Sequence, residues 1–420
     1  MAISGLNVMN KDYDVVVIGG GPAGMMASAE AGKRGKKVLL LEKNKTLGVK
    51  LLITGGGRCN VTNNKLNPRT LASAYGEAGK FLHSTFSQHA VSDTIAYFKQ
   101  LGVDFKEENE GRLFPNTNTA QTIYDALVYD MKLSGVEVRC GNTVANIEPI
   151  KTGGFLIHIN GKAGIRTSSC ILATGGKARP ETGSTGDGFA WLKLLGHTVL
   201  EDTQGLVPLR SSDAWVPALG GVSLSDVGIG VYVDGKIHIK KRGKLLFTHT
   251  GLSGPGILQL SQRVGEILPT GNVSLALDLV PELDHAVLRV QLQTLLVNES
   301  NKKLKNILPT LIPTALVSPV LEQLGIDGET PAHSVRSVDR NTLVSGLKAL
   351  TVNISGLHGL EKAVVAGGGV SLKEVDFKTM QSRLVSGLYL TGDVLNINRP
   401  SGGYSLQLCW STGYVAGLSA

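Results

Sequence analysis

The chain has 420 residues, a formal net charge of +8 at pH 7, 42% hydrophobic residues and 18% charged residues. This composition is typical of a soluble globular protein with two or three domains. No apolar run approaches the roughly 20 residues of a membrane span, and residues 1–11 lack the features of a signal peptide. The four cysteines form no C-x-x-C pair. We therefore expect a cytoplasmic protein with reduced thiols and no metal site.

The N-terminal segment has the pattern of a dinucleotide-binding unit. A strand at 14–18 runs into Gly19-Gly20-Gly21-Pro22-Ala23-Gly24, and a helix at 25–33 and a strand at 37–41 lead to Glu42. Gly19 allows the tight turn, Gly21 lets the backbone approach a pyrophosphate, and Gly24 lets helix and strand pack closely. The pyrophosphate would lie on the helix N-terminus, and Glu42 would accept hydrogen bonds from an adenosine ribose. We interpret this segment as a dinucleotide site rather than a packing turn.

Later segments predict the rest of this sheet and an inserted domain. Two apolar strands, at 169–173 and 387–390, both end in Thr-Gly, which suits the carboxyl edge of a parallel sheet where ligands bind. Between them, short alternating segments at about 199–280 indicate an antiparallel sheet or barrel, and a Leu-rich stretch at about 281–350 indicates several short helices. We predict an α/β nucleotide-binding domain in two parts, residues 1–198 and 351–420, with residues 199–350 inserted.

Two further motifs favour a flavin-like ligand. The loop from Gly48 to Asn60 has three consecutive glycines before Arg58, so backbone N–H groups and a guanidinium would meet an extended anionic ligand. Asp393 can bond a ribityl hydroxyl, and a helix predicted at 405–418 would stabilise negative charge on a reduced flavin. The alternatives are a flexible surface loop and, for Asp393, a simple helix cap.

On these and other segments the chain resembles the BaiN-like flavoproteins, a family that includes aminoacetone-oxidase-like enzymes. The matching segments, in chain order, are Gly19–Gly24, Glu42-Lys43, Thr54–Thr62, Gly111–Pro115, Ala173–Gly176, Thr182–Gly188, Leu246–His249, Gly251–Pro255, Ala366–Leu372 and Gly392-Asp393. The resemblance implies FAD as cofactor. It also implies a glutathione-reductase-like FAD-binding Rossmann domain of the fumarate-reductase type, with an inserted β-barrel plus helical domain.

The resemblance also implies a set of cofactor-binding residues, with Glu42 and Lys43 at the adenosine end. The full set is Gly19, Gly21, Pro22, Ala23, Gly24, Glu42, Lys43, Lys50, Thr54, Gly57, Arg58, Cys59, Asn60, Val144, Thr174, Gly175, Gly392, Asp393, Gly403, Tyr404, Ser405 and Leu406. The chain departs from the family pattern in three places. Asp393 replaces a usual Glu, Ser405 replaces an Asn, and the segment 396–400 (Asn-Ile-Asn-Arg-Pro) replaces an Asp-x-Asp. The last two departures leave substrate choice open.

The candidates for catalysis each have a structural alternative. His249 would serve as an acid–base group, or would bond its own turn. Arg112 would anchor a substrate carboxylate, or be a solvated or structural arginine. Cys59 beside Arg58 would have a lowered pKa and a redox role, or be an inert thiol.

The leading hypothesis is an FAD-dependent oxidoreductase that acts on a small molecule, as an NAD(P)H-linked reductase. The alternative is an amine (aminoacetone-like) oxidase that produces peroxide. The chain lacks a second complete G-x-G-x-x-G and a C-x-x-x-x-C pair, so NAD(P)H would bind transiently rather than in its own domain. Basic clusters at 33–37, 240–244 and 302–305 raise an RNA-associated flavoprotein as a third hypothesis, which the 5% aromatic content disfavours. The sequence indicates neither the substrate nor the oligomeric state.

Overall fold

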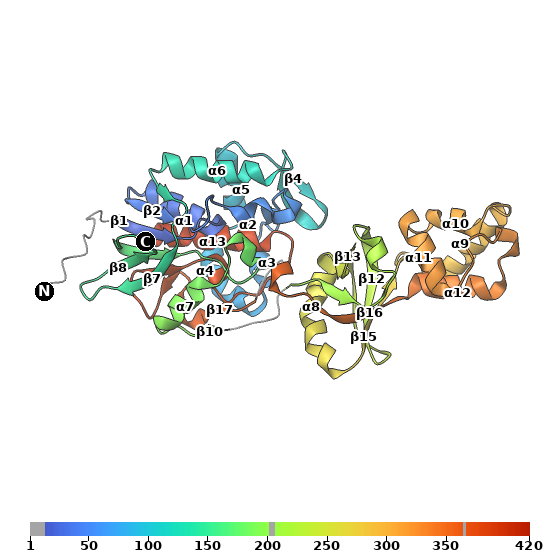
Figure 1. The fold of residues 1–420 in the computed structure, drawn as a ribbon. Helices are drawn as coiled ribbons and strands as arrows, with labels where there is room; N and C mark the ends of the chain where they lie inside the picture. Colours follow the sequence, from blue (N-terminus) through green and yellow to red (C-terminus); the bar gives the residue numbers. More distant parts are fainter. Residues whose placement is uncertain (1–12, 201–205, 364–366) are drawn as a thin grey trace. The chain divides into compact units, whose positions relative to one another are not determined.

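The computed structural model describes residues 13–200, 206–363 and 367–420, and they form two compact units (Figure 1). The first unit contains the described residues 13–200 and 367–420, and the second contains 206–363. Strand β16 (Leu350–Leu357) belongs to the second unit, which therefore extends past residue 350. None of the helices in the described ranges has the length and apolar character needed to cross a lipid bilayer.

A mixed sheet lies at the centre of the first unit, in the order β18-β19-β20-β9-β1-β2-β6. These strands are β1 (Tyr13–Ile18), β2 (Val38–Leu41), β6 (Glu137–Arg139), β9 (Ile165–Leu172), β18 (Val375–Asp376), β19 (Gln381–Ser382) and β20 (Leu388–Leu390). The strands from β20 to β6 are parallel, and Leu390 of β20 lies opposite Leu172 of β9. The two strands that end in Thr-Gly are therefore neighbours, which confirms their predicted place at one carboxyl edge.

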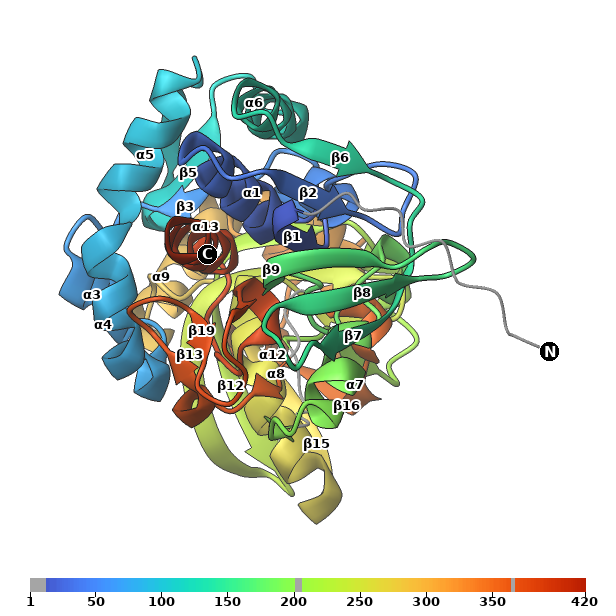
Figure 2. The same ribbon diagram turned by 90° about the vertical axis from the view of Figure 1, so that its left-hand side faces the viewer.

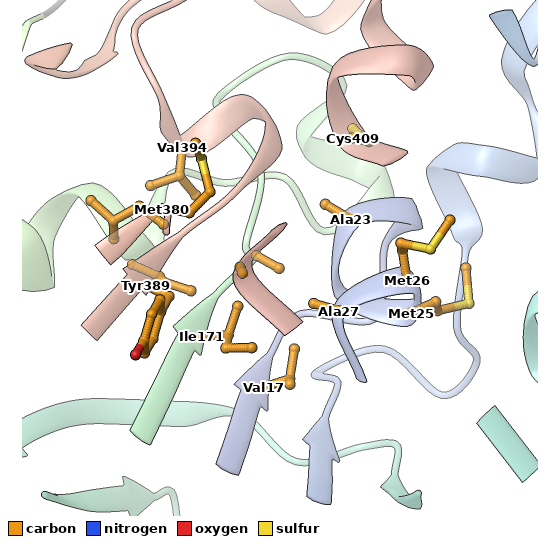
Figure 3. Close-up of a cluster of buried hydrophobic side chains, with 14 of the residues drawn as sticks. Val17, Ala23, Met25, Met26, Ala27, Ile171, Met380, Tyr389, Val394 and Cys409 are labelled. Carbon is orange, nitrogen blue, oxygen red and sulfur yellow. The ribbon is translucent and has the colours of Figure 1, made fainter. Parts of the chain in front are cut away.

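Helices α1 (Pro22–Lys33) and α13 (Tyr404–Ser419) pack side by side against this sheet (Figure 2). Figure 3 shows the apolar layer between the sheet and these helices, with Val17 on β1, Ile171 on β9 and Tyr389 on β20. The two helices approach closely because α13 carries glycine where it meets α1. A Cβ added to Gly413 would lie 2.5 Å from the backbone oxygen of Ala23.

The remaining elements of the first unit surround this core. Strands β7 (Val144–Pro149) and β8 (Phe155–Ile159) extend antiparallel from β9, and β3 (Thr62–Asn63), β5 (Arg112–Pro115) and β4 (Phe105–Glu108) form a separate sheet. The other elements are α2 (Val49–Leu52), α3 (Pro68–Ser73), α4 (Gly79–Gln88), α5 (Val91–Gln100), α6 (Ala120–Leu133), α7 (Asp187–Leu194), β10 (Val199–Leu200) and β17 (Gly369–Val370).

The second unit consists of a closed barrel and several helices. The barrel order is β11-β14-β13-β12-β15-β16, from β11 (Leu209–Ser211), β12 (Ser223–Val233), β13 (Lys236–Thr248), β14 (Gly251–Ser253), β15 (Val273–Asp278) and β16. The helices are α8 (Pro255–Ile267), α9 (His285–Asn298), α10 (Leu304–Ile307), α11 (Thr314–Leu324) and α12 (Ser337–Lys348). Alternating residues such as Val227, Ile229 and Val231 are buried because strands of a closed barrel present every second side chain inward. The predicted α/β architecture with a barrel and helices is confirmed.

We predict that Gly413→Ala destabilises the protein, because the new methyl group would force α13 away from the backbone of α1. Overpacking of this kind costs about 1–3 kcal/mol, and thermal denaturation followed by circular dichroism would show a lower Tm. Gly356→Ala on β16 is the matched control, because nothing lies within 4 Å of a Cβ built there. Equal melting temperatures for the two variants would contradict the close packing of α1 and α13.

Candidate cofactor site

The residues of the G-x-G-x-x-G motif lie between the end of β1 and the start of α1. Gly19 has a φ of +106°, and a Cβ there would lie 2.5 Å from the backbone oxygen of Ala173. A Cβ on Gly24 would lie 1.9 Å from the oxygen of Gly19. Gly21 has open space around its Cα, and no side chain caps the helix that starts at Pro22. The first N–H groups of α1 are therefore available to an anion such as a pyrophosphate.

Glu42 and Lys43 lie at the end of β2. The buried Glu42 carboxylate accepts hydrogen bonds from the N–H groups of Gly20, at 2.7 Å, and Asn44, at 2.8 Å. Each carboxylate oxygen has a second lone pair, so Glu42 can still accept from ribose hydroxyls. Lys43 Nζ lies 2.7 Å from Asp187 Oδ2 at the start of α7. Partial burial acts to raise the pKa of Asp187, but the hydrogen bond from Lys43 holds that pKa below its usual value.

The three-glycine loop packs on the small sheet formed by β3, β5 and β4. The Arg58 guanidinium makes a bidentate ion pair with Glu108, at 2.7 and 3.2 Å, and lies 4.2 Å from the centroid of the Phe114 ring. Asn60 connects this loop to α13, since its amide oxygen can accept from the Gly403 N–H at 3.0 Å. The structure thus gives Arg58 a protein partner, and its predicted contact with the cofactor stays a prediction.

A buried hydroxyl at the end of β9 tests whether this site fits FAD. Thr174 Oγ1 is buried and has no hydrogen-bond partner among the described residues. A Cβ on Gly188 would lie 2.3 Å from this oxygen, so position 188 has no room for a side chain beside the Thr174 hydroxyl. Leaving a buried hydroxyl unpaired costs free energy, and the many polar groups of FAD can supply the partner. The residues present therefore fit this cofactor.

The C-terminal part of the site contains Asp393, which follows β20, and the first turn of α13. Asp393 Oδ2 lies 3.4 Å from Lys50 Nζ. Gly403 has a φ of +99° and caps α13 without a side chain, and Tyr404 accepts a hydrogen bond through its backbone oxygen from the Tyr75 hydroxyl at 2.8 Å. The structure brings the predicted residues of the first and last segments of the chain into one unit. Their contacts with FAD are untested and stay predictions.

The two catalytic candidates lie in different units. Arg112 is on β5, where its Nε donates to the backbone oxygen of Asn109 at 2.9 Å. His249 is exposed in the second unit, and its ring packs on Gly220, where a Cβ would come within 2.6 Å of it. The catalytic roles of both residues stay predictions.

Of the two interpretations of Cys59, the structure supports the inert thiol. The side chain is fully buried, and this burial raises the pKa of the thiol to about 12 despite a hydrogen bond with Thr54. The neighbouring Arg58 does not lower the pKa of this thiol, because its guanidinium forms an ion pair with Glu108. Although Arg58 and Cys59 are neighbours in the sequence, the guanidinium does not interact with the thiol.

Comparison with known proteins identifies the family. The HI0933-like protein Rossmann domain matches residues 13–419. The chain belongs to this family. It is therefore an FAD-dependent oxidoreductase, and the resemblance seen in the sequence is confirmed.

The curated relatives of this chain have two kinds of name. The chain is 30% identical over 408 residues to a 3-dehydro-bile acid delta(4,6)-reductase of Clostridium scindens. The aligned region covers 96% of this chain and 98% of the relative. The chain is 32% identical over 410 residues to a ribosomal RNA dihydrouridine synthase of Escherichia coli, with 96% of each chain covered.

Solved structures support the fold of this chain. A flavocytochrome c3 fumarate reductase has a TM-score of 0.55 at 17% identity, covering 98% of this chain and 78% of that one. A 3-ketosteroid-delta4-(5alpha)-dehydrogenase from Rhodococcus jostii RHA1 has a TM-score of 0.55 at 14% identity, covering 99% and 98%. At these identities the likeness concerns the fold alone, and it confirms the predicted fumarate-reductase type.

Sequence reasoning missed Arg399 as a residue of this site. It is buried, and it contacts both Asp393 and Ser405. The one signal in the sequence was the departure at 396–400 from the family pattern. Sequence alone could not show that this arginine folds inward.

We predict that Thr174→Val weakens FAD binding by about tenfold, the value of one hydrogen bond of about 1.5 kcal/mol. The apoprotein should be no less stable, because valine removes a buried hydroxyl that lacks a partner. FAD titration by fluorescence quenching and urea denaturation of the apoprotein would measure the two effects. Thr182→Val is the control and should destabilise the apoprotein, since the Thr182 hydroxyl donates to the backbone oxygen of Arg179 at 2.7 Å.

We predict that a disulfide reagent such as DTNB labels only Cys140 in the folded protein at pH 8. Cys59, Cys170 and Cys409 are buried, whereas Cys140 is partly exposed. Burial raises the pKa of Cys59 to about 12 and of Cys409 to about 12, so both thiols remain protonated at this pH. Peptide mapping identifies the labelled site, and Cys140→Ser should abolish the reaction. Labelling of Cys59 before unfolding would contradict its burial.

Proposed function

We propose that the protein is an NAD(P)H-linked, FAD-dependent reductase of carbon–carbon double bonds conjugated to a carbonyl group. The observation that carries the proposal is the near full-length similarity to a 3-dehydro-bile acid delta(4,6)-reductase. The second relative's name has the same chemical content, because dihydrouridine is uridine with its C5–C6 double bond reduced, and this bond is conjugated to the C4 carbonyl. A small molecule with such an enone is the leading substrate class.

The protein's part in this reaction is binding, orientation and charge stabilisation. FAD, when bound, supplies the hydride. We propose that Glu42 and Lys43 hold its adenosine end and that the N–H groups at the start of α1 hold the pyrophosphate. Thr174 and Asp393 would bond the ribityl chain. The first turn of α13, from Tyr404 to Leu406, would present backbone N–H groups to the pyrimidine side of the ring.

Reduction of an enone requires a hydride at the β-carbon and a proton at the α-carbon. We propose His249 as the proton donor and Arg112 as the anchor for a carboxylate of the substrate, as their residue types suggest.

Electrons would come from NADH or NADPH bound transiently, since the sequence contains one complete G-x-G-x-x-G motif. We also propose a cytoplasmic location, because the spacing of the four cysteines in the sequence contains no C-x-x-C pair.

We predict that NADPH or NADH bleaches the flavin absorbance of the holoprotein rapidly in anaerobic stopped-flow experiments. Addition of a 3-oxo-Δ4 steroid acid should then restore the oxidised spectrum and consume one enone for each flavin. Free FAD at the same concentration is the control. If neither nucleotide bleaches the flavin and aminoacetone instead releases peroxide in air, the protein is an amine oxidase and the proposal is wrong.

A second candidate is reduction of uridine in RNA. Besides the relative's name, strand β13 favours it, because exposed Lys236, Lys240 and Lys244 follow one another along it. Exposed lysines on one strand can neutralise phosphates of an RNA backbone. Under the same conditions, unmodified ribosomal RNA would replace the steroid as oxidant, and mass spectrometry would detect dihydrouridine. Lys240→Ala should then weaken RNA binding without affecting flavin bleaching by NADPH.

A further inference from the structure

Arg399 is a buried cation at the start of α13. Only 1% of its side chain is exposed. Its guanidinium donates to Ser405 Oγ at 3.1 Å and to the backbone oxygen of Ile397 at 2.6 Å, and it forms an ion pair with Asp393. These contacts fix the charge between the end of β20 and the first turn of the helix.

The surrounding groups leave a net positive charge. Lys50 pairs with the other oxygen of Asp393 at 3.4 Å. Burial acts to raise the pKa of Asp393, but Arg399 and Lys50 hold that pKa below its usual value, so the carboxyl is ionised at neutral pH. This cluster of Asp393, Arg399 and Lys50, which we call the charge triplet, therefore contains two cations and one anion.

Two titratable side chains that interact with the charge triplet, Tyr75 and Cys409, are neutral, as is Tyr404 in the first turn of α13. Burial raises the pKa of the Tyr75 hydroxyl well above its usual value and that of the Cys409 thiol to about 12. Burial also raises the pKa of Tyr404, with a smaller contribution from Glu110. None of these three side chains cancels the positive charge at neutral pH.

The helix adds to this charge. The first turn of α13 contains no acidic residue, and Gly403 caps the helix without a side chain. Its N-terminal N–H groups therefore carry a partial positive charge, which has the same sign as the net charge of the charge triplet. An anion next to this turn would be stabilised by both.

We propose that Arg399 holds the reduced FAD in its anionic form and so raises the flavin's reduction potential. Reduction then takes up two electrons and one proton rather than two protons, and the remaining negative charge lies on the pyrimidine part of the ring. Arg399 acts as a positioning and electrostatic residue, through Asp393 and Ser405. The inference rests on FAD binding and is independent of which substrate the proposed reductase uses.

The test is the two-electron potential of the holoprotein, measured against a reference dye without substrate, between pH 6 and 8. The wild-type potential should change with pH as expected for one proton per two electrons. Arg399→Gln removes one positive charge, so the equilibrium for reduction should become at least about tenfold less favourable, or about 30 mV for a two-electron couple. Its pH slope should move from one proton toward two protons, because removing the charge raises the pKa of the reduced flavin. Arg399→Lys should retain the wild-type values.

Two further variants separate charge from structure. Asp393→Asn raises the net charge of the triplet and should raise the potential. The double variant Asp393→Asn/Arg399→Gln restores the wild-type net charge through Lys50 and should return the potential toward the wild-type value. Arg383→Gln, at an exposed arginine on the β19 side of the same unit, is the control and should change nothing.

These variants decide the proposal even if one of them loses FAD, because Arg399→Lys and Asp393→Asn test the charge independently. Equal potentials across the series, or Arg399→Lys behaving like a loss of charge, would overturn it. Failure of the steroid or RNA assay would leave these potentials unchanged, so the inference and the proposed function fail separately.

Discussion

The close approach of helix α1 to the ends of β1 and β9 is the constraint on which the rest of the first unit depends. At Gly19 and Gly24 the backbone leaves no room for a side chain, since an added Cβ would lie 2.5 and 1.9 Å from backbone oxygens. This packing directs the N–H groups of the first turn of α1 to the carboxyl edge of the sheet. The same edge contains Glu42, Thr174 and Asp393, so one packing contact assembles the elements of the cofactor site.

Packing also determines the charge state of groups around the site. Asp393 is ionised although only 17% of its side chain is exposed, because two cations are paired with it. Cys59 is neutral because burial raises the pKa of its thiol, and the preceding Arg58 pairs with Glu108 rather than with this thiol. The three-dimensional partners of a side chain, rather than its neighbours in the sequence, thus control its chemistry. A catalytic assignment for this protein has to start from these partners.

The family assignment depends on features of the fold, whereas the proposed chemistry depends on particular side chains. An FAD-binding fold needs the fingerprint, the parallel strands and the glycine-mediated packing of α1 with α13, and these are all in one unit. Selection of a substrate depends on groups that the fold does not specify. The departures from the family pattern at 396–400 place a cation beside Asp393, and our proposal for Arg399 gives this cation a role in the charge environment of the cofactor.

The sequence by itself determined the nucleotide-binding unit, the neighbouring Thr-Gly strands, the barrel with its helices and the family. These features follow from local patterns: β-branched runs, glycine spacing and alternation, which act over a few residues. Only the tertiary structure decided that Arg58 pairs with Glu108, that Cys59 is inert and that Arg399 is buried against Asp393. Such contacts join residues far apart in the chain, 50 positions between Arg58 and Glu108 and 343 positions between Lys50 and Asp393. Their energies depend on burial and on which partner is nearest in space, and a linear pattern contains neither.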